Sequence, residues 1–301
     1  MVENPTLSKT NLRMADWSNL KSEFVWAYEG VVGAPYRNTR NHHQGQSALL
    51  LRSGHLTIEN ENGVVRVDEG MWAFPREGSR LQRFSDNARV VSVHFQVYWP
   101  GNQPLFDFQT ALVFKSSDYP ELEKQSRRLC RQVDRVFPGI GAQLPWTRGS
   151  LSNYLELQIV FTRWLNIYVN SLLAAGVTPS RLGQVDERVL RAAQILDDLP
   201  VDVSFDERWL AKEVGLSASQ LDRIFGKQFD LTPRQYFENR KLARAKDLIR
   251  SAPLTIKQIA YETGFRSLPY FSRWFHAKTG QSPRAFKKAV FDTEVAPPVA
   301  R

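Results

Sequence analysis

Two segments near the carboxyl end of the chain carry the same pattern. Residues 210–233 read LAKEVGLSASQLDRIFGKQFDLTP, and residues 259–283 read IAYETGFRSLPYFSRWFHAKTGQSP. At an offset of 49 and then 50 residues, the matched pairs include Leu210 with Ile259, Gly215 with Gly264, Leu221 with Phe271, Arg223 with Arg273 and Pro233 with Pro283. A repeat of this detail indicates one supersecondary unit that is used twice.

Each copy predicts a helix, a tight turn and a second helix. Gly215 and Gly264 can adopt the positive φ that such a turn needs, and Ser217 and Ser267 suit the N-cap of the helix that follows. The second helices are predicted at about 217–227 and 267–278, where apolar residues recur at helical spacing. This arrangement is a helix-turn-helix, whose second helix can enter the major groove of DNA.

A long helix is predicted between the two copies. Thr232 suits its N-cap and Pro233 its first position, and the pattern continues to about Arg250. Some 18 residues at 1.5 Å each give a length of roughly 27 Å. Because neighbouring major-groove faces recur at roughly 34 Å, such a helix can hold two reading helices against one face of the duplex.

Residues 205–288 resemble the DNA-binding domain of the AraC family of transcription regulators. The matching residues are Leu210-Ala211, Gly215–Ser217, Leu221–Phe225, Pro233, Arg240–Ile249, Ile256, Ile259-Ala260, Gly264-Phe265, Tyr270–Arg273, Phe275, Thr279-Gly280 and Ser282-Pro283. Asp230 departs from the family, which often has glycine there, but aspartate tolerates a left-handed backbone. The resemblance implies a sequence-specific DNA-binding regulator that is not an enzyme.

Candidate DNA contacts fall into two groups. The resemblance assigns base-facing positions to Ser219, Asp222 and Arg223, and helical phase adds Pro269, Tyr270, Ser272 and Arg273. An acidic Asp222 facing DNA is costly unless it accepts from a cytosine amine or orients Arg223. The candidates for phosphate contacts are Ser217 and Ser267 at helix N-termini, together with Arg240, Lys241, Arg266 and Lys278. For each cation, solvated surface charge is the alternative.

The positive charge of the chain is concentrated over the repeat. Residues 208–290 contain 17 Lys and Arg against 6 Asp and Glu, a net +11. The remaining residues contain 23 and 25, a net −2, which agrees with the total of +9. Basic charge on a segment with groove-reading geometry favours double-stranded DNA as the partner over a membrane surface.

Composition excludes several other classes. Cys130 is the single cysteine, so an intramolecular disulfide and a cysteine-based zinc cluster are both excluded. The sequence shows no signal segment and no run of 18 apolar residues, and we expect a cytoplasmic protein without a membrane anchor.

The amino-terminal part is typical of strands. Short β-branched or aromatic runs alternate with turn signals at Ser47–Leu51, His55–Glu59, Val64–Val67, Leu81–Phe84 and Arg89–Val97. Their order resembles the cupin-like sensor domain of AraC-family members. The expected fold class is therefore α+β with two domains: a cupin-like β-barrel or sandwich with flanking helices, and an all-α domain with two helix-turn-helix units joined by a long helix. The expected boundaries are 1–176 for the effector-sensing and dimerisation domain, 177–184 for the linker, 185–292 for the DNA-binding domain and 293–301 for the tail.

A small-molecule effector, a sugar or related metabolite, is expected in the amino-terminal domain. The pocket candidates are His43, Trp72, Arg80, His94 and Trp99, which could stack on a polar ligand or hydrogen-bond to it. Core packing is the alternative for each of these side chains, and a polar loop is the alternative for His42-His43. No metal and no cofactor are expected, since Arg80 and Gln82 stand where a cupin would need another histidine.

Helices are expected at 118–137, 150–175 and 186–199. The second is apolar over so much of its surface that it either packs on two sides within its domain or is shared with a second subunit. The family precedent is a homodimer through sensor-domain helices, and an activator would also contact RNA polymerase. Two alternatives stay open: a cupin-type metalloenzyme with a DNA-binding appendage, and a regulator controlled by a protein partner.

Overall fold

A computed structural model of the chain describes residues 14–41, 45–99, 103–180, 186–229, 231–251 and 254–294. The chain folds into two compact units. One unit is formed by the chain up to Arg181, and the other by Leu182–Val295, with Trp99–Gln103 grouped in the second.

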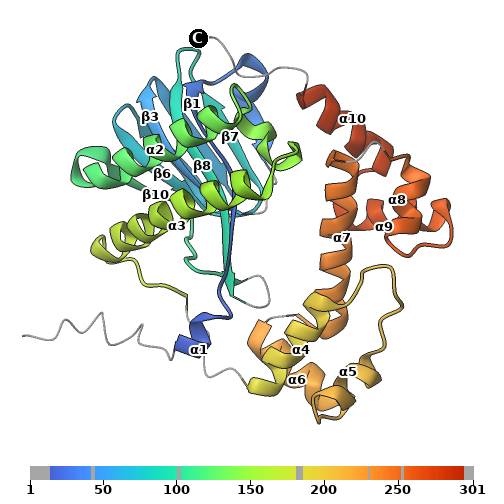
Figure 1. The fold of residues 1–301 in the computed structure, drawn as a ribbon. Coiled ribbons are helices and arrows are strands. Elements are labelled where there is room, and N and C mark those ends of the chain that lie inside the picture. The colour runs from blue at the N-terminus through green and yellow to red at the C-terminus, as the bar shows by residue number, and fades with distance from the viewer. Residues whose placement is uncertain are drawn as a thin grey trace, which may run out of the picture. The chain divides into compact units, whose positions relative to one another are not determined.

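The amino-terminal unit is a sandwich of two antiparallel sheets (Figure 1). The strand order is β1-β8-β3-β6-β10 in one sheet and β2-β7-β4-β5 in the other, and β9 pairs with β8 off this path. The strands are β1 (Lys21–Val31), β2 (Asn38–Asn41), β3 (Gln46–Ser53), β4 (His55–Asn60), β5 (Gly63–Asp68), β6 (Met71–Pro75), β7 (Arg80–Phe84), β8 (Arg89–Trp99), β9 (Gln103–Pro104) and β10 (Ala111–Lys115).

The five predicted strand runs are confirmed as β3, β4, β5, β7 and β8. Successive residues of each strand face opposite sides of their sheet. In β3 and β8, Ser47 stands opposite His94 and Leu49 opposite Ser92. The core between the sheets is built from buried apolar residues of both, namely Val32, Leu49, Leu51, Leu56, Ile58, Val67, Ala73, Ala88 and Val90.

Two helices, α2 (Pro120–Val136) and α3 (Leu151–Ala174), cover the outer face of the first sheet (Figure 1). Aromatic contacts join α3 to that face, since the Phe95 ring lies 4.8 Å from the Trp164 ring and 5.0 Å from the Tyr168 ring. Trp164 Nε1 donates to Ser126 Oγ at 2.7 Å, which satisfies a buried indole and ties α3 to α2. Short helical turns complete the unit at α1 (Met14–Trp17), η2 (Ala34–Tyr36), η3 (Ser116–Asp118) and η4 (Gly141–Trp146).

The carboxyl-terminal unit is all helical. Its helices are α4 (Glu187–Asp198), α5 (Glu207–Glu213), α6 (Ala218–Phe229), α7 (Pro233–Ser251), α8 (Ile256–Glu262), α9 (Leu268–Thr279) and α10 (Pro283–Glu294). The pairs α5–α6 and α8–α9 are the two predicted helix-turn-helix units. The 19-residue α7, about 28 Å long, joins them (Figure 1).

Each end of α7 belongs to a different core. Tyr236 and Phe237, near its start, pack with the buried residues of α4, α5 and α6. Ala245 and Ile249, near its end, pack with those of α8 and α9. The helix therefore carries one helix-turn-helix unit on each half of its length.

Reciprocal side-chain caps fix where three of these helices begin. Thr232 Oγ1 accepts from Gln235 N while Thr232 N donates to Gln235 Oε1, and Thr255 and Gln258 form the same box at α8. Ser217 and Gln220 repeat it at α6. Each box satisfies backbone N–H groups that a helix N-terminus leaves unpaired.

Candidate nucleic-acid interface

Helix α6 presents a polar face away from its core. Leu221 and Phe225 are buried, whereas Ser219, Arg223 and Lys227 are exposed. Among the described residues, the Arg223 side chain forms no hydrogen bond or ion pair. Its five N–H donors are therefore available to an external acceptor, such as a guanine edge.

Asp222 does not share that face. Its side chain is half-buried, and its Oδ1 atom is sealed from solvent with no hydrogen-bond partner in the described part of the chain. The Glu207 carboxyl of α5 lies beside it, and hydrogen bonding with Asp222 together with burial raises the pKa of Glu207. We therefore correct the assignment of Asp222 as a base contact: position 222 lies on the flank of α6 that packs toward α5. Glu207 and its neighbour Arg234, 3.8 Å away, were not identified from the sequence, because nothing in the helical phase of α6 marks them.

Helix α9 repeats the arrangement of α6. Phe271 and Phe275 are buried, and Pro269 and Arg273 are exposed. Tyr270 is 59% exposed although its ring lies 5.8 Å from that of Phe265, and Ser272 is half-buried. Arg273, like Arg223, has no hydrogen bond or ion pair with any residue that the structure describes.

The turn before α9 carries groups that suit a phosphate. Ser267 is the N-cap residue, but its hydroxyl accepts no capping hydrogen bond from the described residues, in part because Pro269 in the first turn has no N–H to donate. Arg266 and Lys278 are exposed near the two ends of the helix. Ser217, at the equivalent turn, is also exposed, but its hydroxyl serves the cap of α6. An exposed helix N-terminus favours an anion.

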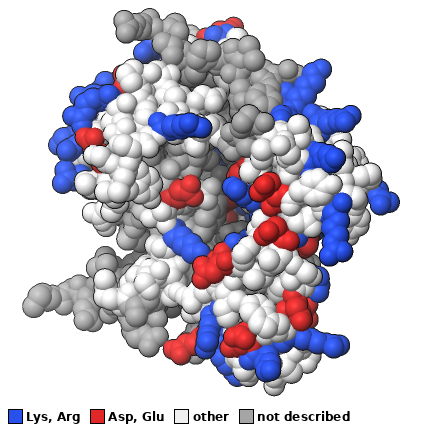
Figure 2. All heavy atoms as spheres, turned by 45° about the vertical axis from the view of Figure 1, so that its right-hand side comes forward, with Lys and Arg blue, Asp and Glu red and all other residues white. Residues whose placement is uncertain are grey.

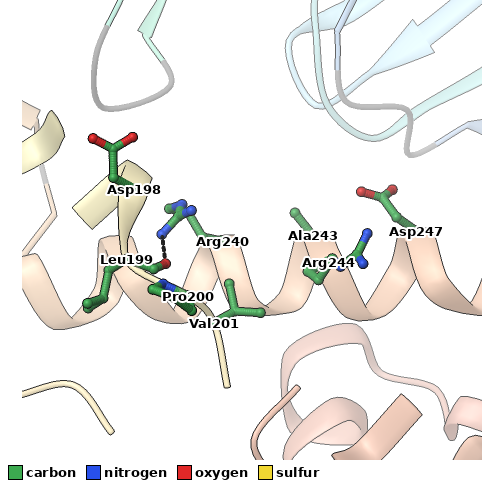
Figure 3. A pocket seen from close by; sticks show the side chains of 8 residues that line it. All are labelled: Asp198, Leu199, Pro200, Val201, Arg240, Ala243, Arg244 and Asp247. Carbon is green, nitrogen blue, oxygen red and sulfur yellow. Dashed lines mark hydrogen bonds between the residues drawn. The ribbon is translucent and has the colours of Figure 1, made fainter. Parts of the chain in front are cut away.

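Arg240 serves the fold, and we correct its assignment as a phosphate contact. Its guanidinium donates to the carbonyl oxygens of Leu196 and Asp197. It also donates to the carbonyl oxygen of Leu199 at 3.0 Å, the bond drawn in Figure 3. The Asp197 carboxylate, which also accepts from Tyr236, lies 3.7 Å away. Arg240 thus caps the carboxyl end of α4 from α7, in a surface groove of about 400 Å³.

Lys241 is also turned inward. It is half-buried, and its ammonium lies 5.4 Å from the Phe237 ring and 5.3 Å from the Phe265 ring. Burial lowers its pKa. Phe237 belongs to the first core and Phe265 to the second, so this cation–π contact joins the two helix-turn-helix units and takes Lys241 out of the set of free phosphate contacts.

Lys and Arg side chains are spread over the surface, with Asp and Glu between them (Figure 2). The exposed basic residues of the carboxyl-terminal unit include members of the reading helices and of their flanks, namely Arg208, Lys212, Arg223, Lys227, Arg234, Arg244, Lys257, Arg266, Arg273, Lys278, Arg284 and Lys288. This composition suits an anionic partner.

In the amino-terminal unit, two of the predicted pocket residues meet. Arg80 of β7 and His94 of β8 are 3% and 2% exposed, and both contact the hydroxyl of Ser47 on β3. The His94 ring stacks on Trp26 of β1 with centroids 4.1 Å apart. Neither Ser47 nor Trp26 was predicted as a pocket residue. Ser47 could have been found, because it stands opposite His94 on the neighbouring strand and so lies on the same face of the sheet.

The other pocket candidates lie elsewhere. Trp72 stacks on Phe74, and Phe74 contacts Tyr168 of α3. Ala73, which lies between Trp72 and Phe74 in the strand, faces the core between the sheets. Trp72 is therefore on the opposite side of the sheet from Arg80 and His94, and its assignment to a shared pocket is wrong. Trp99 is buried at the end of β8, and His43 lies outside the described residues.

Two features of other protein classes are absent from the part of the chain that the structure describes. No group of three or more His, Cys, Asp or Glu side chains there is placed to hold a metal ion. None of the helices described has both the length and the apolar character that crossing a bilayer requires.

Two helix-turn-helix units on one connecting helix, each with an exposed arginine on its second helix, define a helix-turn-helix DNA-binding protein. A helix-turn-helix domain family matches residues 210–289. The HTH-type transcriptional activator RhaS of Shigella boydii is 31% identical over 256 residues, which cover 82% of this chain and 87% of that protein. The chain belongs to the AraC family of transcription regulators.

One further relative matches over a shorter segment, and one solved structure matches over most of the chain. The arabinose operon regulatory protein of Escherichia coli is 33% identical over 103 residues, which cover 34% of this chain and 35% of that protein. The match thus spans about a third of the length of that relative. The crystal structure of ToxT from Vibrio cholerae superimposes with a TM-score of 0.49 and 13% identity, covering 93% of this chain and 100% of that chain.

Proposed function

We propose that this protein is a transcription regulator that binds specific sequences of double-stranded DNA through α6 and α9. The observation that carries the proposal is the pair Arg223 and Arg273, which occupy equivalent positions of the repeat. Both are exposed, and neither has a partner among the described residues. Arginine on the outer face of a reading helix can grip O6 and N7 of guanine with two hydrogen bonds.

The other proposed DNA contacts are of two kinds, to bases and to phosphates. Ser219, Pro269, Tyr270 and Ser272 complete the base-facing set, and Arg266, Lys278 and the hydroxyl of Ser267 contact phosphates. Ser217 contributes the N-terminus of α6. With α7 about 28 Å long, the two helices reach neighbouring major grooves, which recur at roughly 34 Å.

The proposed DNA binding is tested by measuring the affinity of the protein for duplex DNA at several salt concentrations. Neutralising phosphates releases counterions, so log affinity falls linearly with log salt. Lys278→Ala should weaken binding to all sequences alike and reduce the slope by about one. Asp247→Ala, which removes an acidic residue of α7 outside the reading helices, is the control for surface charge in general. Affinity for duplex DNA that did not depend on salt would overturn the proposal.

The amino-terminal unit, in this proposal, binds a small-molecule effector such as a sugar or related metabolite. Arg80, His94 and Ser47 support it, since three polar side chains from three strands converge between the sheets. An effector shifts the DNA-binding unit between states only if it binds those states with different affinity. Screening metabolites for a rise in melting temperature, then for a change in operator affinity, tests this step.

The proposed assembly is a cytoplasmic homodimer formed through α3. Leu151, Tyr154, Leu155 and Ile159 are exposed on one face of that helix, which leaves a contiguous apolar stripe in the isolated chain. A second copy with the same stripe would bury it by an isologous contact. RNA polymerase is a further partner if the protein is an activator, as the name of the Shigella boydii relative describes that protein.

A further inference from the structure

Arg80 is a buried cation whose donors are incompletely used. Its Nη1 donates to the carbonyl oxygen of Arg76 at 3.3 Å, and its Nη2 to Ser47 Oγ at 3.4 Å. Both distances lie beyond the usual range of about 2.7–3.2 Å for such bonds. Nε is sealed from solvent and has no hydrogen-bond partner among the residues that the structure describes. The guanidinium edge formed by Nε and Nη2 therefore carries donors that the described residues leave unsatisfied or poorly satisfied.

The charge of Arg80 also lacks a directly bonded counter-ion within the described chain. The nearest acidic group is Glu77, whose Oε1 accepts from Gly45 N at 2.9 Å and from the Tyr98 hydroxyl at 2.5 Å. Its Oε2 accepts from Gln46 Nε2 at 3.2 Å. Burial lowers the pKa of Arg80 to about 10, so the group is still charged at neutral pH. Glu77 attracts Arg80 through charge but makes no hydrogen bond to it, so the donors of the guanidinium are not used by a counter-ion of the described chain.

The surroundings of Arg80 offer further ligand contacts. Ser47 Oγ lies 3.0 Å from His94 Nδ1, and His94 stacks on the ring of Trp26. A hydroxyl, an imidazole and an aromatic surface thus adjoin the guanidinium, at one end of a sandwich whose core farther along the strands is built mainly from apolar residues. Such a set can bind the charged group and the polar substituents of one small molecule.

We infer that the effector, on the proposed function from which this step starts, is a small monocarboxylate whose carboxylate binds Nε and Nη2 of Arg80. A carboxylate has two oxygens in one plane that match the guanidinium fork. A sugar acid meets this requirement, whereas a neutral sugar does not.

Melting temperatures of the full-length protein test the inference with matched pairs of probes. The pairs are D-galacturonate with D-galactose, and benzoate with benzamide, each at millimolar concentration and constant ionic strength. They are applied to the wild type, to Arg80→Gln and to Arg83→Gln. Arg83 is the control, because it lies on the same strand but is exposed and paired with Glu59.

At least one carboxylate should raise the melting temperature of the wild type and of Arg83→Gln by about 5 °C at a hundredfold excess over Kd, and leave Arg80→Gln unchanged. The neutral twin should have no effect. If Arg80→Gln does not fold, the contrast between carboxylate and neutral twin in the wild type decides.

Equal shifts from the neutral twins would overturn the monocarboxylate assignment and leave a small-molecule effector standing. Absence of any shift would also overturn it. Neither result bears on DNA binding, which the salt titration of the same protein measures separately.

Discussion

A Cβ atom placed on Gly264 would lie 2.5 Å from the carbonyl oxygen of Asp202. Gly264 turns the second helix-turn-helix unit with a φ of 78°, and Asp202 precedes α5 in the first. The two helix-turn-helix units are therefore in direct backbone contact at Gly264 and Asp202. Gly215, the counterpart of Gly264 in the repeat, has a φ of 68° and nothing in the described chain within 4 Å of its Cβ position. Both glycines allow the positive φ of the turn, but only Gly264 also allows the close approach of a second backbone segment.

We predict that Gly264→Ala destabilises the protein more than Gly215→Ala. Both changes impose left-handed strain of about 1–2 kcal/mol. Only Gly264→Ala also forces two backbones apart, which adds about 1–3 kcal/mol. Urea denaturation of both variants measures the difference. Equal losses would show that the contact between the two units contributes nothing to stability.

Arg240→Gln should destabilise the carboxyl-terminal unit by about 2–3 kcal/mol, because hydrogen bonds from a charged donor to the last carbonyls of α4 are lost. Arg244→Gln, an exposed neighbour on α7, should change stability by less than about 0.5 kcal/mol. Thermal denaturation distinguishes the two. If Arg240→Gln kept its stability and lost DNA affinity instead, Arg240 would be a phosphate contact after all.

The Glu207–Asp222 pair predicts a pH dependence. The pKa of Glu207 is raised in the folded protein, so between its ordinary value of 4.5 and the raised value the folded state binds more protons than the unfolded state. The contribution of Glu207 to stability is therefore complete below 4.5 and falls as pH rises through this window. Glu207→Gln, which can donate to the orphaned Asp222 oxygen, should be more stable than the wild type by about 1 kcal/mol at pH 7.

The gain from Glu207→Gln should shrink as the pH is lowered toward 4. Melting curves of both proteins from pH 4 to 8 measure it. A stability difference that stayed constant over this range would show that proton sharing at Glu207 is not its cause.

Ile159→Glu should convert a dimer into a monomer by placing a charge on the apolar α3 stripe, at its most carboxyl-terminal residue. Val64→Glu is the control, since Val64 on β5 is 64% exposed and Ile159 is 69% exposed. Light scattering after size-exclusion chromatography gives the mass of each. A wild type that is monomeric at micromolar concentration, or a Val64→Glu that dissociates equally, would contradict the proposed dimer.

The sequence was sufficient for the helix-turn-helix repeat, because glycine turns, caps and apolar spacing are local signals. The structure places α6 and α9 within two residues of the predicted helices at each end. Strand β10, which was not predicted, has only five residues and no clear alternation to reveal it. Strand β6 was not predicted as a run because it is buried on both faces and reads as a continuous apolar segment.

The orientation of single side chains was less accessible. Arg240 looked like a surface cation because the α4 carbonyls that it caps lie more than 40 residues away in sequence. Asp222 flanks Arg223, and its turn toward Glu207 depends on how α5 and α6 cross. Trp72 and Arg80 lie in different sheets, and which faces of the two sheets meet is set by their register rather than by any local pattern.

Selection of binding sites from a randomised duplex library tests the central claim most directly, with the wild type, Arg223→Ala and Arg273→Ala compared. Each variant should lose base preference at one position, worth about 1–3 kcal/mol, and the two positions should lie about one helical turn, roughly 10 base pairs, apart. Unchanged preferences in both variants, or loss at the same position in both, would contradict a protein that reads DNA with α6 and α9.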